Sequence, residues 1–275
     1  MSLRGFGSFR SLRLSKPHSP KGRKPRAHTP YQLFLMNRLF LSILFFAALA
    51  YSHKTDSLFV PPKPEKPLRY CSSAEKWIEY ATHNSKLVEI TDMEGLRMDL
   101  RYATFNNVTG HDMYCGIQRA FIHKDGLPKL KRALSIIAKE LPGYTLVIFD
   151  AARPMYAQSV LKQSVAGTPY SHFVSSGKTG GLHNYGLALD LGLADSTGNL
   201  LDMGADFDSF ERCAGIVGEA DALKSGRLTQ QQIDNRNLLR NIMKRAGWVM
   251  LPSEWWHFNA FTRAYTKEHY PLFPM

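Results

Sequence analysis

Apolar and polar positions follow helical spacing in three segments of the chain and strand-like spacing in four others. In the helical segments, apolar residues recur three or four positions apart. The first of them opens with a serine as its expected N-cap, and the second is closed by Pro142 and Gly143. In the strand-like segments, apolar residues alternate with polar ones or form a short β-branched run. The predicted helices cover 72–83, 127–143 and 230–246, and the predicted strands cover 95–104, 144–154, 184–194 and 247–251.

These elements mix without a regular strand-helix-strand rhythm, and no internal repeat is visible. Such a mixture predicts an α+β fold in which helices flank a largely antiparallel sheet. A chain of 275 residues has room for one sizeable domain or two small ones. The continuous pattern favours a single domain at 71–275.

The first 50 residues differ from the rest of the chain. Residues 1–35 form a basic leader, and residues 36–50 combine a positive charge at Arg38, a twelve-residue apolar run and small residues at Ala48 and Ala50. This order predicts a secretory signal peptide and a periplasmic or otherwise exported protein. Twelve residues rise about 18 Å as a helix, less than a hydrocarbon core of about 30 Å, so no stable membrane span is expected after signal removal.

Two alternatives for this region stay open. The apolar run could be an uncleaved signal anchor, and a translation start at Met36 would leave residues 1–35 untranslated. Residues 51–70 contain four prolines between positions 61 and 67 and predict an extended Pro-rich tether.

The distribution of charge argues against nucleic acid as a partner. The formal net charge is +12, but nine of the Lys and Arg residues and no Asp or Glu lie in the first 50 residues, so the remainder carries +3. The basic excess therefore belongs to the leader and not to a folded face.

Three cysteines are present, at Cys71, Cys115 and Cys213. In an exported protein they predict one disulfide and one spare thiol, with a pairing that the sequence does not reveal. The alternative, to which we give equal weight, is that all three cysteines are buried and reduced. Their spacing indicates no Cys-ligated metal.

Two short motifs combine the residue types of a catalytic metal site. "GLHNYGLALDLG" holds His183 and Asp190 on either side of Gly186, and "EWWHF" holds Glu254 and His257. If the chain turns at Gly186 into a strand, His183 and Asp190 converge. A catalytic zinc usually takes three N and O ligands and keeps one position for water, and a nearby carboxylate in an apolar wall can move the proton. A lone histidine beside a glycine is more often structural. The metal-site interpretation therefore depends on the second motif, which adds Glu254 and His257.

Glu254 and His257 differ in parity along the chain, and a regular strand would point them to opposite faces. We therefore expect a bend or bulge near Trp255. The alternation does not show which of Trp255 and Trp256 faces the metal.

Five motifs in order resemble the zinc-dependent D-alanyl-D-alanine dipeptidases, the vancomycin-resistance type and their periplasmic relatives. They are "RYATFNNVTG", "FDAARP", "HNYGLALD", "MGADFDSF" and "EWWHF", and the resemblance runs from about Leu87 to Phe273. It implies a zinc D,D-peptidase or hedgehog-like fold, one Zn²⁺ per chain and a small D-amino-acid dipeptide as substrate. It says nothing of the oligomeric state.

The resemblance also implies residue roles. His183, Asp190 and His257 would bind zinc, with Glu254 as general base and then acid. Arg153 would stabilise the oxyanion of the tetrahedral intermediate, because a guanidinium stays charged and donates two hydrogen bonds in a fixed geometry. The alternative role for Arg153 is an ion pair with Asp150 alone.

In the same way, Asp208 would bind the free amino group of the dipeptide, with help from Tyr102. The alternative for Asp208 is a helix N-cap before "SFERC". A carboxylate that pairs with this amine would favour dipeptides over longer peptides.

The sequence departs from the family pattern in three places. Gly181 replaces a usual Ser or small polar residue, Asn106 and Val108 replace Asp and Phe, and "FDAARP" lacks the usual Gly-Tyr before its arginine. These departures concern substrate preference. The other functions considered are a D,D-carboxypeptidase or L,D-endopeptidase that acts on muropeptides, and a zinc-containing binding domain without turnover.

Overall fold

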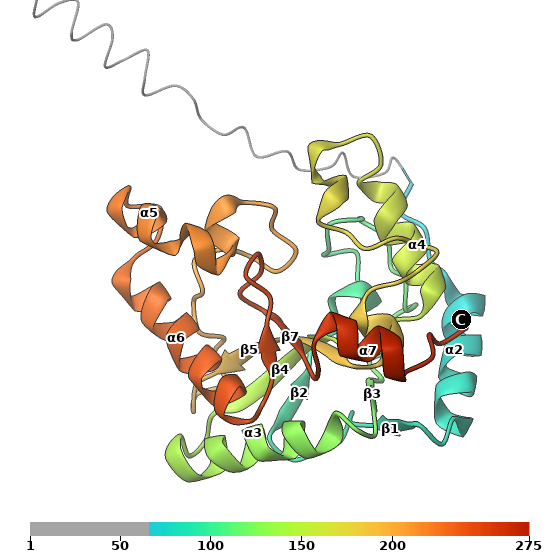
Figure 1. The fold of residues 1–275 in the computed structure, drawn as a ribbon, viewed down its shortest axis with the longest axis horizontal. Coiled ribbons are helices and arrows are strands. Elements are labelled where there is room, and N and C mark those ends of the chain that lie inside the picture. Colours follow the sequence, from blue (N-terminus) through green and yellow to red (C-terminus); the bar gives the residue numbers. More distant parts are fainter. Residues whose placement is uncertain (1–65, 275) are drawn as a thin grey trace, which may run out of the picture. The chain divides into compact units, whose positions relative to one another are not determined.

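The structure is a computed structural model and describes residues 66–274 (Figure 1). The predicted leader at 1–35, the signal at 36–50 and most of the tether lie outside the described residues. No helix within 66–274 is both long and apolar enough to cross a membrane.

A mixed sheet of five strands forms the centre of the domain. Its first two strands run parallel, and the other three pairings are antiparallel. The predicted α+β fold with a largely antiparallel sheet is confirmed. In spatial order the strands are β2 (Leu96–Met98), β4 (Thr145–Asp150), β5 (Ala188–Ala194), β7 (His257–Asn259) and β6 (Val249–Met250). A separate antiparallel pair is formed by β1 (Leu87–Glu89) and β3 (Phe121–His123).

Six α-helices surround the sheets within the described residues (Figure 1). They are α2 (Cys71–His83), α3 (Leu127–Glu140), α4 (Met155–Ser164), α5 (Glu219–Lys224), α6 (Gln230–Arg245) and α7 (Arg263–His269). The three predicted helices correspond to α2, α3 and α6. The sequence pattern did not predict α4, α5 or α7, each of which has ten residues or fewer.

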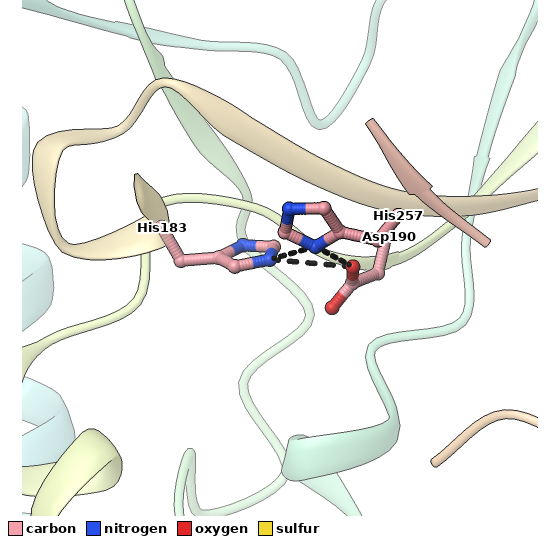
Figure 2. Close-up of side chains that lie close together, drawn as sticks. All are labelled: His183, Asp190 and His257. Atoms are coloured by element: carbon pink, nitrogen blue, oxygen red, sulfur yellow. Dashed lines mark hydrogen bonds and ion pairs between the residues drawn. The ribbon is translucent and has the colours of Figure 1, made fainter. Parts of the chain in front are cut away.

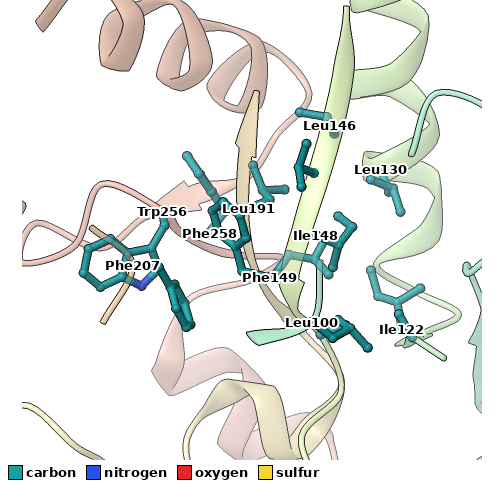
Figure 3. Packing of buried hydrophobic residues seen from close by; sticks show 14 of the residues in the cluster. Leu100, Ile122, Leu130, Leu146, Ile148, Phe149, Leu191, Phe207, Trp256 and Phe258 are labelled. Atoms are coloured by element: carbon teal, nitrogen blue, oxygen red, sulfur yellow. The ribbon is translucent and has the colours of Figure 1, made fainter. Parts of the chain in front are cut away.

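Helices α3 and α6 pack against each other and share one hydrophobic core with β4 and β5. Figure 3 shows Leu130 of α3 facing Leu146 and Ile148 of β4. Phe207 and Trp256 lie away from this aliphatic layer, with ring centroids 5.6 Å apart. The sheet therefore has an aliphatic side and an aromatic side.

Strand β5 is buried along its whole length, although its sequence alternates in a way that predicts one solvated face. The reason is its central position between β4 and β7, where both faces are covered. Gly192 lies against the ring of Phe149, which an added Cβ would approach to 2.9 Å. The only charged residue of β5, Asp190, consequently has to find its partners inside the protein.

A β-bulge ends strand β4. Ile148 pairs with Leu191 and Asp150 pairs with Asp190, so two steps on β4 match one step on β5. Such an extra residue re-aims the side chains that follow it. Here it brings Asp150 to the same side of the sheet as Asp190.

Two local predictions were wrong. Helix α2 begins at Cys71, one residue before the first serine, and its N-cap Tyr70 makes no side-chain capping bond. The chain is held at this point by the Cys71–Cys115 disulfide and by the ion pair of Arg69 with Asp112. The predicted strand at 95–104 shortens to β2, and Tyr102 lies on a 3₁₀ turn, η1 (Arg101–Ala103).

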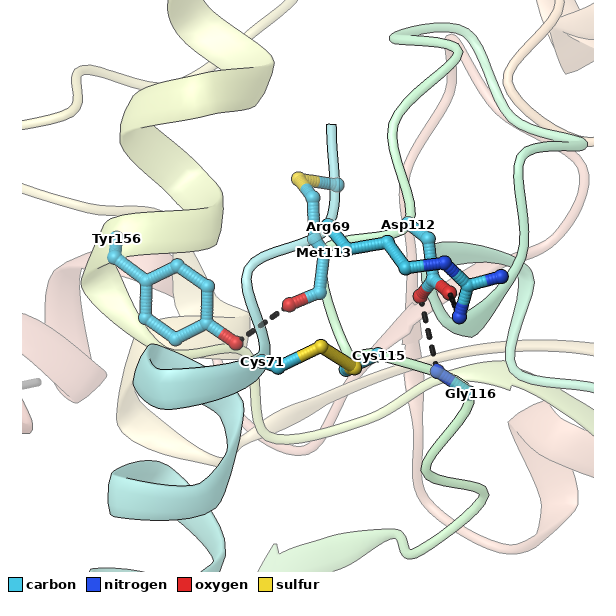
Figure 4. The surroundings of a disulfide bond; sticks show 7 residues. All are labelled: Arg69, Cys71, Asp112, Met113, Cys115, Gly116 and Tyr156. Atoms are coloured by element: carbon cyan, nitrogen blue, oxygen red, sulfur yellow. Dashed lines mark hydrogen bonds and ion pairs between the residues drawn. A yellow bond between two sulfur atoms is a disulfide. The ribbon is translucent and has the colours of Figure 1, made fainter. Parts of the chain in front are cut away.

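A disulfide joins Cys71 at the start of α2 to Cys115 in the loop after η1. Figure 4 shows the contacts around it: Arg69 pairs with Asp112 at 3.0 Å, and the hydroxyl of Tyr156 donates to the carbonyl of Met113 at 2.8 Å. Cys213 is buried and free. The expectation of one disulfide and one spare thiol is confirmed.

Candidate functional site

Three side chains converge on one point of the aromatic side of the sheet. His183 lies on η3 (Leu182–Tyr185), Asp190 on β5, and His257 at the first position of β7. His257 Nδ1 lies 2.9 Å from Asp190 Oδ1 and 3.1 Å from His183 Nε2. His183 Nε2 lies 3.2 Å from the same carboxylate oxygen. Figure 2 shows this triangle, and all three residues are at least nine-tenths buried.

Local backbone geometry explains the convergence. Gly186 ends η3 in the left-handed region, with φ of 64°, which glycine adopts without strain. An added Cβ would also lie 3.0 Å from the backbone nitrogen of His123. The chain then enters β5, where Asp190 is directly opposite His257 in the antiparallel ladder. The predicted turn at Gly186 is therefore present.

The outer nitrogen of each imidazole is bonded to an oxygen. His183 Nδ1 lies 2.8 Å from the carbonyl oxygen of Ala151, and His257 Nε2 lies 2.8 Å from Oδ1 of Asn259. Both oxygens accept, so each outer nitrogen carries the proton of a neutral ring. The two inner nitrogens then present lone pairs to each other and to Asp190, which is an arrangement that fits a bound cation.

The electrostatics of the three residues also favour a positive charge between them. When no metal is bound, a proton on His257 Nδ1 occupies this position. Burial opposes this protonation, but the hydrogen bond to Asp190 and the carboxylate charge raise the pKa of His257 to about 9. Burial alone would raise the pKa of Asp190, but the two histidines lower it below its usual range. One carboxylate and two imidazoles form a donor set that suits a divalent metal of the zinc type.

Glu254 lies beside this group. Its Oε2 is 3.8 Å from His257 Nδ1, and burial raises the pKa of its carboxyl group. The chain turns at Pro252 and Ser253 and bends at both tryptophans before β7 begins. The expected irregularity is confirmed, and it allows Glu254 and His257 to share one side despite their opposite parity.

The two tryptophans have different surroundings. Trp256 lines the cavity at the site, and its ring packs edge-on against Phe207. Trp255 directs its indole nitrogen to the carbonyl oxygen of Ala205 at 2.9 Å. Within the described chain, Trp256 is thus the indole that forms the apolar wall.

Arg153 follows β4 and is held by three acceptors. Its Nε donates to Asp150 at 2.8 Å, one terminal nitrogen donates to Gln158 at 3.0 Å, and the other donates to Asp190 at 3.4 Å. The ion pair with Asp150 is therefore present, but it aims the guanidinium at the site. A guanidinium has five N–H groups, so these bonds leave one on each terminal nitrogen.

Asp208 and Tyr102 meet as predicted. The Tyr102 hydroxyl donates to Oδ1 of Asp208 at 3.0 Å, while Oδ2 is buried without a partner among the described residues. Burial raises the pKa of Asp208 to about 8. Asp208 lies in a turn with φ of 62° and is not a helix N-cap. A buried carboxylate oxygen without a hydrogen bond is suited to a cationic ligand.

All seven residues predicted for the site line one cavity of about 650 Å³. The prediction missed Gln158, which is 1% exposed and bonds to Arg153. It also missed Tyr114, whose hydroxyl donates to Oδ1 of Asp150 at 2.8 Å. The helical spacing after Pro154 was the available signal for Gln158, whereas no motif marks Tyr114.

Comparisons with known proteins agree with this geometry. The sequence profile of the family described as D-ala-D-ala dipeptidase matches residues 83–274. The chain belongs to this family. A D-alanyl-D-alanine dipeptidase of Escherichia coli strain K12 is 38% identical over 163 residues, which make up 59% of this chain and 78% of the relative.

Two further relatives with the same name come from Enterococcus faecium and Enterococcus faecalis strain V583. They are 27% and 26% identical, and each alignment covers 65% of this chain and 92% of the relative. Members of the D-ala-D-ala dipeptidase family are metallopeptidases, so the chain is a peptidase and a hydrolase.

The three departures from the family pattern have different structural settings. Gly181 and Val108 line the cavity, whereas Asn106 is exposed on the loop. Ala151, in the third departure, supplies the carbonyl that orients His183. The departures therefore reach the walls of the cavity but leave the metal donors intact.

Asp208→Asn should stabilise the metal-free protein at neutral pH. The pKa of this carboxyl is about 8 in the folded protein and about 4 in the unfolded chain, so between these values it ionises only on unfolding, which destabilises the fold. The variant should gain about 4 kcal/mol at pH 7, three units above the unfolded pKa, and almost nothing below pH 4. Urea unfolding of chelated protein across this range measures the difference. Exposed Asp206→Asn is the matched control, and an equal pH dependence in both variants would contradict the assignment.

Proposed function

We propose that the protein is a zinc dipeptidase that hydrolyses D-alanyl-D-alanine, or a related D-amino-acid dipeptide, to free amino acids in peptidoglycan metabolism. The observation that carries this proposal is the position of Glu254 beside the convergent donors of His183, Asp190 and His257, in a member of the D-ala-D-ala dipeptidase family.

His183, Asp190 and His257 would hold one zinc ion. When bound, zinc acts as a Lewis acid on the scissile carbonyl and makes water a stronger nucleophile. The residues supply the remaining functions, which are proton transfer, charge stabilisation and substrate binding.

Glu254 is the proton carrier in this proposal. Burial raises the pKa of its carboxyl group, which brings it nearer to the pH at which a general base also serves as a general acid. It accepts a proton from the attacking water and passes it to the nitrogen of the leaving amino acid. Trp256 excludes bulk water from this transfer.

Arg153 stabilises the oxygen that becomes negative when the carbonyl is attacked. Its position is fixed by Asp150 and Gln158 before substrate arrives, so little reorganisation is needed in the transition state. Its two remaining N–H groups are the donors for this charge.

Asp208 receives the ammonium group of the dipeptide. Its free Oδ2 gives the ammonium an acceptor, and the hydroxyl of Tyr102 holds the other oxygen in place. The amine of a longer peptide lies farther from the scissile bond and would leave Asp208 unpaired, which is costly for a buried carboxylate. The proposal therefore favours a dipeptidase over a carboxypeptidase.

A substrate panel tests this function. The purified domain should release alanine from D-Ala-D-Ala but not from the L,L isomer or from a muropeptide that ends in D-Ala-D-Ala. Chelation should abolish the release, and Zn²⁺ should restore it. Chromatography of the amino acids measures each reaction. Preferential cleavage of the muropeptide would support the carboxypeptidase alternative, and full activity without metal would exclude the mechanism.

Glu254→Gln should retain zinc and lose kcat by about three orders of magnitude or more, because the amide cannot accept the proton. Metal analysis and steady-state kinetics measure the two properties separately. Glu211→Gln is the matched control, since Glu211 lines the same cavity but bonds to Cys213 and Arg227. A loss of zinc in Glu254→Gln would mean that Glu254 is a ligand.

We also propose that the protein is exported, with the segment at 36–50 as its signal. The Cys71–Cys115 disulfide supports this proposal, because structural disulfides persist in oxidising compartments.

Reduction of the Cys71–Cys115 disulfide should lower the free energy of unfolding of the protein by about 2 to 4 kcal/mol, because the bond joins residues 44 positions apart and restricts the unfolded chain. Urea unfolding with and without reductant measures the loss. Cys213→Ala should keep this sensitivity, and the double variant Cys71→Ser/Cys115→Ser should lack it. Three free thiols in protein isolated from the cell envelope would contradict the proposal.

A further inference from the structure

Ser175 presents an unbonded hydroxyl to the cavity. It lies in the loop between η2 (Pro169–His172) and η3, and it lines the same cavity as the metal donors. Within residues 66–274, its backbone carbonyl accepts a hydrogen bond at 2.9 Å, but its Oγ has no partner. A polar group that faces a substrate cavity without a protein partner is available to a ligand.

Gly181 leaves the space that this hydroxyl occupies. A Cβ added to Gly181 would lie 3.0 Å from Ser175 Oγ and 3.3 Å from Ser175 Cβ. The backbone of Gly181 is extended, with φ of −109°, so its conformation does not require glycine. The absence of a side chain at 181 is therefore explained by the position of Ser175.

Gln158 fixes Ser175 relative to Arg153. Its amide nitrogen donates to the carbonyl of Ser175 at 2.9 Å, and its amide oxygen accepts from Arg153 at 3.0 Å. Gln158 is 1% exposed, so this connection is shielded from water. The loop that carries Ser175 is thus tied to the guanidinium at the reaction centre.

The contacts around Arg153 connect it both to the Asp208 pair and to Ser175. The ring of Tyr102, which bonds to Asp208, lies 5.0 Å from the Arg153 guanidinium carbon. The same guanidinium donates to the amide oxygen of Gln158, and the amide nitrogen of Gln158 donates to the carbonyl of Ser175. Asp208, Arg153 and Ser175 line one cavity, so Ser175 is available to the carboxylate of a dipeptide whose amine lies at Asp208 and whose carbonyl lies at Arg153.

We propose that Ser175 donates its hydroxyl hydrogen bond to the terminal carboxylate of the dipeptide and so determines how the leaving residue is held. This inference rests on the proposed function. It assigns the recognition of the substrate's two ends to different parts of the chain, with Asp208 at the amine and Ser175 at the carboxylate.

A serine exchange between positions 175 and 181 tests the proposal. Ser175→Ala should lower kcat/KM for D-Ala-D-Ala about tenfold, mainly through KM, as expected for a lost hydrogen bond to a charged group. Gly181→Ser alone should also lower activity, because its Cβ meets Ser175. The double variant Ser175→Ala/Gly181→Ser should recover to within about threefold of wild type, because it returns a hydroxyl to the same space.

A purely structural role for Ser175 would not be rescued by serine at 181. A double variant no more active than Ser175→Ala would therefore overturn the proposal, as would unchanged kinetics in Ser175→Ala. Equal far-UV circular dichroism and zinc content in the four proteins control for folding.

D-alanyl-D-alaninamide, measured as a substrate or as a competitive inhibitor, tests the contacted group. The effect of Ser175→Ala should shrink to about twofold for this analogue, whose C-terminal amide is uncharged, and an equal effect on both compounds would overturn the carboxylate assignment. Wild-type protein that cleaves no D,D-dipeptide would instead contradict the proposed function itself.

Discussion

The antiparallel pairing of β5 with β7 is the constraint on which the site depends. It places Asp190 directly opposite His257, although the two residues are far apart in the sequence. The bulge in β4 then sets Asp150 on that face as well. A shift of one residue in this register would turn the carboxylates into the aliphatic core, so the metal donors and the fold are specified together.

Buried charge is balanced within this frame. Arg153 connects Asp150 with Asp190, and the two histidines share the carboxylate of Asp190. Glu254 and Asp208 differ from these residues because burial raises the pKa of both. Glu254 lies 3.8 Å from His257, and among the described residues Asp208 accepts a hydrogen bond only from the neutral hydroxyl of Tyr102. The carboxylates that organise the site are therefore paired, and those that would meet water or substrate are left with capacity to bind a proton or a cation.

The sequence predicted the metal donors because spacing and residue type are local properties. His183 and Asp190 are separated by one turn and one strand step, and Glu254 and His257 by a single irregular turn. The choice between Trp255 and Trp256 was not predictable, because it depends on bends that only the packing against Phe207 and Ala205 determines. Ser175 and Gln158 were missed for a related reason. They are joined by a hydrogen bond between helix α4 and a loop, and the loop has no periodic sequence pattern that would reveal it.

The two histidines are oriented by different kinds of acceptor. Ala151 holds His183 through the main chain, and any residue at 151 provides the same carbonyl. Asn259 holds His257 through a side chain. A single substitution can therefore remove this acceptor or, as in Asn259→Asp, give it a negative charge. A substitution at 259 can therefore alter the orientation of His257, whereas a substitution at 151 leaves the carbonyl that orients His183 in place. Differences in metal affinity among relatives are expected at position 259 and not at position 151.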